Sequence, residues 1–327
     1  MKNKHAIQAL VLTCALACLA ITPATFGMDP PWRVASTAQE VSEYMLHESA
    51  QKGDTVTVRM LLEQGVDMMT ERGWRSYNVF TPLHHAALGN RAELALELIR
   101  RDTDMEARNE SLNYETPLHS TVSEAGDRVG VVLVLLDHGA AVNAKNARDE
   151  TPLHKAAHWN AAGTTALLLK HGAELEAHDY DGETPLYKAT DYGQNSTEAM
   201  QVLLERGANP NAKTRGSWTP LHVAASKYYY PHKVQLLLQY GANPNAQTGC
   251  GETPLHLARD KVKIARLLLT ADADTEARDH HGTKPLHSSR RVESWQQVKH
   301  PSDEVVRALL EAGTQMEESE AHGFCGR

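Results

Sequence analysis

The 327-residue chain lacks an excess of basic residues. Its 33 lysines and arginines are outnumbered by 41 aspartates and glutamates, which gives a formal net charge of −8. A protein that binds the phosphate backbone of nucleic acid without regard to sequence needs a basic stripe, so we expect no nucleic-acid partner. Apolar residues make up 41% and charged residues 23%, which indicates a folded soluble protein rather than a disordered one.

Cysteine is also scarce. Of four cysteines, Cys14 and Cys18 lie within the first 27 residues. If that segment is cleaved off, as considered below, the mature chain keeps only Cys250 and Cys325. These two are far apart in the sequence, and nothing indicates that their Cα atoms approach within the ~7 Å that a disulfide requires. We therefore expect two unpaired thiols, and the pairing stays open.

Motifs for chemistry are missing as well. The chain contains no Gly-x-Ser-x-Gly and no phosphate-binding glycine pattern. Cys250 stands between two glycines in a loop, where a base is hard to position for nucleophilic catalysis. Of the eighteen histidines, six recur in one repeated motif and the others follow no ligand spacing, and the adjacent His280 and His281 have no cysteine near them. The sequence therefore predicts no enzyme activity, no cofactor and no metal site.

The longest apolar stretch lies at the N-terminus. Residues 1–27 begin with Lys2 and Lys4, continue with sixteen mostly apolar residues from Ala6 to Ile21, and end in small residues. This order is typical of a signal peptide, and the stretch is shorter than the ~20 residues that span a bilayer. We expect cleavage and export to the periplasm or the medium, with an uncleaved anchor as the alternative. Removal would leave 31 basic and 41 acidic residues, a net charge of −10.

A second alternative for this segment is lipidation. Ala15-Leu16-Ala17-Cys18 resembles a bacterial lipobox, although that motif prefers leucine where this chain has Ala15. A lipid anchor at Cys18, attached to the envelope, is therefore the alternative to a released protein.

What the sequence does contain is a repeat. Thr-Pro-Leu-His, or a close variant, begins at Thr81, Thr116, Thr151, Thr184, Thr219 and Thr253, and a seventh copy begins at Lys284. A second pattern consists of two aliphatic residues, two further residues and a glycine. It ends at Gly65, Gly139, Gly172, Gly207, Gly241 and Gly313, with Asp102 and Asp272 in the glycine place of two more copies. Two patterns in one phase, about 34 residues apart, indicate a stack of repeated units.

Each pattern has a physical reason. Threonine before proline starts a helix, because the hydroxyl caps free backbone N–H groups and proline fits the first helical position. The following leucine points inward, and the small residues after it let neighbouring helices approach. A second helix has apolar residues at helical spacing. It ends at glycine, which adopts the left-handed conformation without strain, and aspartate is one of the few substitutes. The polar residues before the next threonine contain turn signals and predict projecting hairpins.

These motifs resemble the ankyrin repeat family over residues 42–316. The first half of the family motif appears in Gly182-Glu183-Thr184-Pro185-Leu186, and the second in Gly139-Ala140-Ala141-Val142-Asn143-Ala144. The resemblance implies an all-α repeat solenoid of helix-turn-helix units joined by projecting β-hairpin loops. It also implies that the motif histidines hold neighbouring hairpins, and that a protein partner binds the concave surface of hairpin tips and inner helices.

We predict four segments. They are a signal peptide at 1–27, a flexible leader at 28–41, the repeat domain at 42–316, and a frayed acidic tail at 317–327, with the repeat domain divided into eight units at 42–80, 81–115, 116–150, 151–183, 184–218, 219–252, 253–283 and 284–316. The first unit lacks Thr-Pro-Leu-His, as a capping repeat can.

Function should lie where the copies differ. The loop from Gly65 to Thr81 is longer than the others and rich in arginine and aromatic residues, which is the composition of interface hot spots. Tyr180 and Trp218 are expected at the tips of other hairpins, and Trp159 at the end of an inner helix. The candidate protein-binding residues are therefore Arg72, Trp74, Arg75, Tyr77, Tyr114, Trp159, Tyr180 and Trp218. The alternatives are that Trp74 or Phe80 packs on the capping repeat, and that Tyr228 to Tyr230 pack over neighbouring loops. The final copy carries an insertion around Glu293 to Pro301, with Trp295.

We expect a monomer that binds a protein partner of basic or mixed charge, since the scaffold is acidic. Two settings remain open, a scaffold in the envelope and a secreted effector that binds a host protein. A small-molecule or metal receptor is a third reading, which would need a closed pocket that an open solenoid rarely forms.

Overall fold

The computed structural model describes residues 38–66, 80–122, 126–191, 196–227, 230–259, 261–288 and 303–312. Several predictions therefore lie outside the described residues: the signal peptide, most of the leader, Arg72, Trp74, Arg75 and Tyr77 in the long loop, the Trp295 insertion and the acidic tail. Among the described residues, no helix is both long enough and apolar enough to cross a membrane.

The chain divides into two compact units, Met1–Pro117 and Leu118–Arg327. The described helices of the first unit are α2 (Ala38–Lys52), α3 (Thr55–Glu63), α4 (Pro82–Leu88), α5 (Ala92–Ile99) and the short 3-10 helix η2 (Glu110–Leu112). Helix α2 packs on α4, and α3 packs on α5. Helix α6 (Pro117–Ser120) begins at the boundary between the units.

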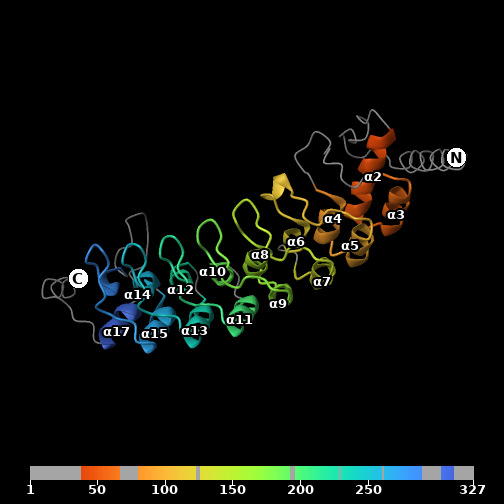
Figure 1. Cartoon of the computed structure of the whole chain (residues 1–327). Coiled ribbons are helices and arrows are strands. Elements are labelled where there is room, and N and C mark those ends of the chain that lie inside the picture. The colour runs from red at the N-terminus through yellow and green to blue at the C-terminus, as the bar shows by residue number, and fades with distance from the viewer. Residues whose placement is uncertain are drawn as a thin grey trace, which may run out of the picture. The chain divides into compact units, whose positions relative to one another are not determined.

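The second unit repeats one arrangement (Figure 1). The short helices of its inner layer follow the Thr-Pro-Leu-His motifs: α8 (Pro152–His158), α10 (Pro185–Asp191), α12 (Pro220–Ser226), α14 (Pro254–Ala258) and α16 (Pro285–Ser288). The outer layer consists of α7 (Val129–Asp137), α9 (Ala162–Lys170), α11 (Glu198–Glu205), α13 (Pro231–Gln239), α15 (Val262–Thr270) and α17 (Asp303–Glu311). Each inner helix from α8 to α14 packs on the next inner helix. This arrangement confirms the predicted all-α repeat solenoid.

The inner helices begin as the sequence predicts. Thr81 has extended backbone angles, its side chain accepts the backbone N–H of His84, and the His84 ring accepts the N–H of Thr81 in return. The same reciprocal cap starts the helices after Thr151, Thr219 and Thr253, each followed by proline at the first helical position. The Thr-Pro pair therefore fixes where every one of these helices starts.

The outer helices end as predicted too. Gly139 and Gly172 have φ of +91° and +88°, and the two aspartates in the glycine place, Asp102 and Asp272, have φ of +65° and +59°. The left-handed conformation is thus retained where glycine has been replaced.

The core consists of the motif leucines and the small residues after them. Leu83, Leu153 and Leu221 are fully buried, and so are alanines such as Ala86 and Ala156. Burying one such leucine contributes about 1.5–3 kcal/mol, and the small residues allow the inner helices to pack closely.

The first copy starts earlier than the sequence indicates. Helix α2 begins at Ala38, four residues inside the predicted leader and before the expected start at Ser42. Ala38, Gln39 and Glu40 all favour helix, and no proline or glycine interrupts them.

Candidate functional site

The loops of the second unit are short hairpins, here called fingers: 146–150, 179–183, 214–218, 248–252 and 279–283. Each is closed by a backbone hydrogen bond between its first and last residue, from Asn146 N to Glu150 O at 3.0 Å in the first finger. The Asn146 carboxamide oxygen also accepts the N–H groups of Arg148 and Glu150. Among the described residues the hairpins contain no strand, because a single turn is closed by one such pair and by its own side chain.

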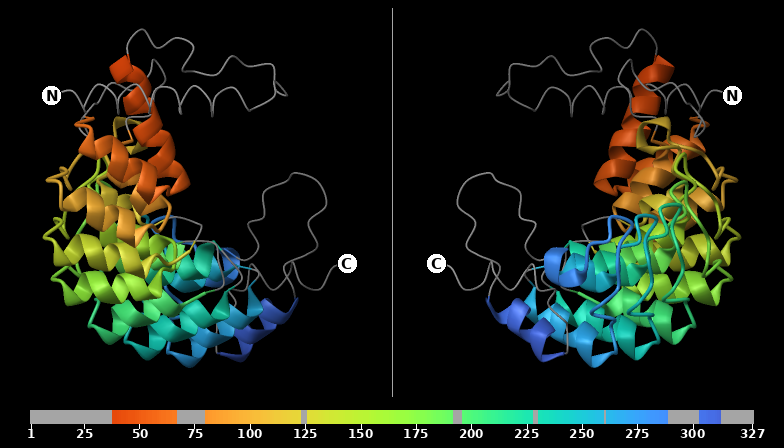
Figure 2. Two further views of the ribbon diagram at one scale, coloured as in Figure 1. Left: turned by 90° about the vertical axis from the view of Figure 1, so that its right-hand side faces the viewer. Right: turned by 90° about the vertical axis from the view of Figure 1, so that its left-hand side faces the viewer.

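Neighbouring fingers are joined to each other by their backbones. Tyr180 N donates to Arg148 O at 2.8 Å, and Arg215 N donates to Asp181 O at 3.1 Å. The same bond recurs from Gly249 to Gly216 and from His280 to Cys250. The fingers of the second unit therefore form one row, visible as parallel loops in Figure 2.

Glycine is needed at one point of this row. Gly182 has φ of +76°, and a Cβ atom placed there would lie 3.0 Å from the backbone nitrogen of Arg215. The absence of a side chain lets finger 214–218 approach finger 179–183.

The motif histidines connect each inner helix to the next finger. The Nε2 atom of His119 lies 3.0 Å from Glu150 O, that of His154 lies 3.0 Å from Glu183 O, and that of His256 lies 2.9 Å from Thr283 O. In the first unit, His84 makes the same contact with Glu115 O at 3.1 Å. This confirms the role that the resemblance implied for these histidines.

The bonds also fix the protonation of the rings. The Nδ1 atom of His154 accepts the N–H of Thr151, so Nε2 carries the proton and donates it to the carbonyl. Burial lowers the pKa of His84 and His154 below the ordinary value. In the described part of the chain, no group of three His, Cys, Asp or Glu side chains is placed to hold a metal ion.

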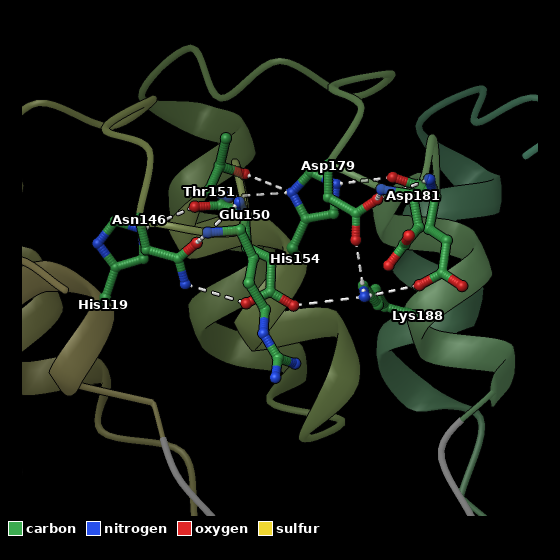
Figure 3. Close-up of polar contacts among 10 residues, drawn as sticks. His119, Asn146, Glu150, Thr151, His154, Asp179, Asp181 and Lys188 are labelled. Atoms are coloured by element: carbon green, nitrogen blue, oxygen red, sulfur yellow. Dashed lines mark hydrogen bonds and ion pairs between the residues drawn. The ribbon is translucent and has the colours of Figure 1, made fainter. Parts of the chain in front are cut away.

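One copy departs from this scheme. In the copy that starts at Thr184, Tyr187 stands in the motif-histidine place, followed by Lys188 on α10. The Lys188 amine lies 2.6 Å from Glu183, 2.7 Å from Asp179 and 3.3 Å from Glu150, so that it joins carboxylates from two fingers (Figure 3). Burial alone would lower the pKa of Lys188, but the hydrogen bonds that its ammonium donates to Asp179 and Glu183 raise the pKa above the ordinary value. The amine therefore stays charged and neutralises part of the acidic finger bases.

Sequence reasoning did not find Lys188. The comparison of copies gave only a weak signal, because the residue after the motif histidine is apolar in two later copies, Val223 and Leu257, but the preceding copy has a lysine there as well, Lys155. The acidic partners could not be read from the sequence, since one of them belongs to the finger of the preceding copy.

The candidate aromatic residues occupy different places. Tyr180 lies at a finger tip and is 59% exposed. The Arg215 guanidinium of the next finger lies 4.6 Å above its ring. Trp159 ends α8, half-buried, with its ring 5.1 Å from that of His158. Tyr114 is 45% exposed in the finger of the first unit that Asn109 and Glu115 close.

Trp218 does not lie at a tip. Its carbonyl accepts the N–H of Thr214 at 2.9 Å, so it closes the base of its finger, and its half-buried ring lies 5.9 Å from that of His222. The structure thus places Tyr180 and Trp218 on neighbouring fingers, Tyr180 at the tip of one and Trp218 at the base of the other.

Phe80 and Tyr230 lie against the helices that follow them in the chain. The Phe80 ring stacks at 5.2 Å on His85 of α4, which belongs to the second predicted unit and not to the capping repeat. Tyr230 is half-buried, and the Lys233 amine lies 5.7 Å from its ring. Tyr228 and Tyr229 lie outside the described residues.

Comparison with known proteins gives consistent matches. A family model described as "Ankyrin repeats (3 copies)" matches residues 46–146, 118–214, 169–248 and 221–320. Human ankyrin repeat and SOCS box protein 3 is 31% identical over 180 residues, which are 54% of this chain and 33% of that protein. Palmitoyltransferase AKR1 of Lachancea kluyveri is 27% identical over 181 residues, 54% of this chain and 24% of that protein. The chain thus spans a minor part of both relatives.

A solved structure matches more completely. The crystal structure of the ankyrin repeat domain of Bcl-3, described as a unique member of the IkappaB protein family, superposes with a TM-score of 0.58 at 29% identity. The match covers 71% of this chain and 98% of that one.

Proposed function

Because the chain belongs to the ankyrin repeat family, we propose that it is a non-enzymatic scaffold that binds a protein partner with its finger tips and inner helices. The observation that carries this proposal is the exposure of Tyr180 on a finger that is bonded to both neighbours. The exposed part of a large apolar ring contributes little to folding, whereas it contributes to binding once a partner covers it.

The rigidity of the finger row supports the same function. Each finger is held by a bond across its own base, a bond to the next finger and, in most copies, a histidine from the inner helix. A partner that docks on such a row orders few additional groups, so more of the contact energy appears as affinity.

The test places a photo-activated cross-linking residue at Tyr180 in the full chain, in cells that express it. Tyr240 at the end of α13 is the matched control, since it is an exposed tyrosine (39%) on the outer layer. We expect a covalent protein adduct from position 180 and none of that mass from position 240. Equal adducts from both positions, or none from 180, would rule out the tips as the binding surface.

We further propose that the protein is exported. The charge and apolar pattern of residues 1–27 supports this. Expression of the full sequence and of a version without residues 2–27 should place the first outside the cytoplasm and the second inside, as measured by fractionation. Retention of a Cys18→Ser variant in the same fraction, with unchanged detergent partitioning, would exclude the lipid anchor.

The secreted effector is the alternative setting for the same binding surface. It differs in one measurable respect, because the protein would then be recovered from host cells and not from the envelope fraction. Adducts formed at position 180 with a host protein would favour it over a scaffold for the cell's own proteins.

A further inference from the structure

Three successive finger tips carry an arginine, a tyrosine and a second arginine. These residues, Arg148, Tyr180 and Arg215, are all exposed and are here called the tip triad. Backbone bonds of 2.8 Å (Tyr180 N to Arg148 O) and 3.1 Å (Arg215 N to Asp181 O) hold their fingers side by side. The backbones of the three tips are therefore held side by side, with Tyr180 on the middle finger.

The ring orders one of the two cations. The guanidinium carbon of Arg215 lies 4.6 Å from the centre of the Tyr180 ring, a cation–π contact. A guanidinium that rests on a ring keeps its N–H groups at the edge of its plane, where they fit a carboxylate in a bidentate manner. Among the described residues, neither the Arg148 nor the Arg215 side chain forms an ion pair.

The carboxylates near the tip triad differ in availability. Those at the finger bases are engaged, because Glu150, Asp179 and Glu183 surround Lys188, and Asp179 also accepts two backbone N–H groups. At the tips themselves Asp149 and Asp181 are exposed and balance the two arginines. Net charge at the tips therefore does not select a partner, whereas the ordered guanidinium does.

We propose that the tip triad binds an acidic segment of the protein partner, with one carboxylate on Arg215 over the Tyr180 ring and a second on Arg148. The inference rests on the proposed function and specifies the partner's chemistry. It differs from the basic or mixed partner expected from the composition, because the three carboxylates at the bases of these fingers surround Lys188 and the two at the tips are matched by the two arginines.

The test is a selection of random twelve-residue peptides, displayed on phage, against the immobilised full chain at neutral pH. Peptides that the unmodified chain retains are then measured by fluorescence anisotropy on three variants. They are Arg148→Ala/Arg215→Ala, Asp149→Asn/Asp181→Asn, and the control Lys170→Ala/Arg206→Ala, which removes two exposed cations from the ends of the outer helices α9 and α11.

We expect enrichment of aspartate and glutamate in the retained peptides. Their affinity should fall about tenfold or more in the double arginine variant, which is the scale of one lost charge-assisted hydrogen bond. It should stay within about twofold in the control and be equal or higher in the aspartate variant, where a repulsive charge is removed.

Three results would overturn the inference: enrichment of lysine and arginine, acidic peptides that bind the double arginine variant equally well, or no retained peptide. The first leaves the scaffold function standing if a Tyr180→Ala variant loses those basic peptides. The cross-linking result at position 180 is independent of charge, so the two proposals can fail separately.

Discussion

Buried neutral histidines should make the stability of the repeat stack sensitive to acid. His222 shows it best. It is fully buried, its Nδ1 accepts the N–H of Thr219 at 3.1 Å, and its Nε2 donates to Ala246 O at 3.0 Å and Glu252 O at 3.1 Å. A second proton on Nδ1 would face the Thr219 N–H, a donor against a donor. Burial lowers the pKa of His222 from 6.5 to about 4.

The pKa values of His222 in the unfolded and folded chain determine how the free energy of unfolding changes with pH. An unfolded histidine binds a proton near pH 6.5, while His222 in the folded chain resists it until about pH 4. Below pH 6.5 the unfolded state therefore holds more protons, so the free energy of unfolding is highest above that pH and falls as the pH drops towards 4. The slope is about 1.4 kcal/mol per pH unit, and the loss at pH 5 is about 2 kcal/mol for this one side chain.

The variant His222→Gln isolates this contribution. Glutamine keeps an amide N–H for the carbonyls and cannot ionise near neutral pH, so its stability should fall about 2 kcal/mol less than the unmodified chain between pH 7 and pH 5. Urea unfolding followed by circular dichroism at several pH values gives both slopes. His178→Gln, at an exposed position, is the control. Identical slopes for the unmodified chain and His222→Gln would refute the reasoning, whatever the offset at pH 7.

Three further substitutions probe contacts between copies. Asp127 accepts the N–H groups at the start of α9, in the next copy, so Asp127→Ala should lower the free energy of unfolding by about 1–2 kcal/mol in urea titrations, while Asp137→Ala should change little. Gly182→Ala should lower the melting temperature clearly, whereas Gly216→Ala, where φ is not positive and the nearest atom is 3.4 Å away, should be mild. Lys188→Met should cost about 3 kcal/mol at neutral pH by leaving its carboxylates without a counter-charge, and a loss that persists unchanged at pH 3 would contradict this.

The repeat architecture follows from the sequence because its determinants are local. A threonine cap, a proline at the first helical position and a left-handed residue at a helix end each depend on a few neighbouring atoms. Asp102 and Asp272 illustrate this, since both take the left-handed conformation that the glycine place requires. The histidine contacts were predicted only through the family resemblance, because their partners lie about thirty residues away.

The site was less predictable, because its contacts join residues that differ between copies. Trp218 was expected at a tip, but the residue before the motif threonine closes the finger base, and the neighbouring His222 ring partly covers it. The partner of Tyr180 is Arg215, whose place over the ring depends on how closely Gly182 lets two fingers approach. Such contacts depend on the spacing of the stack and have no signature within one copy.

The backbone amides of finger 214–218 should be the least protected from hydrogen exchange in the row of fingers. In five other copies a histidine holds the last carbonyl of the next finger. Here the place is filled by Tyr187, whose hydroxyl forms no hydrogen bond with finger 214–218 in the described structure. Finger 248–252, held by His222, is the internal reference. One missing hydrogen bond is worth about 1 kcal/mol, so amides of finger 214–218 should exchange with deuterium about fivefold faster.

The substitution Tyr187→His should restore the missing contact and slow exchange in finger 214–218 alone, as measured by mass spectrometry of its peptide. Equal protection of both fingers in the unmodified chain would show that the Arg215–Asp181 backbone bond and the stacking on Tyr180 already replace the histidine. The two outcomes differ in consequence for binding. A loosely held finger would let Arg215 adjust to a partner's carboxylate, but binding would then cost the entropy of ordering that finger. A fully held finger would present the guanidinium already in place.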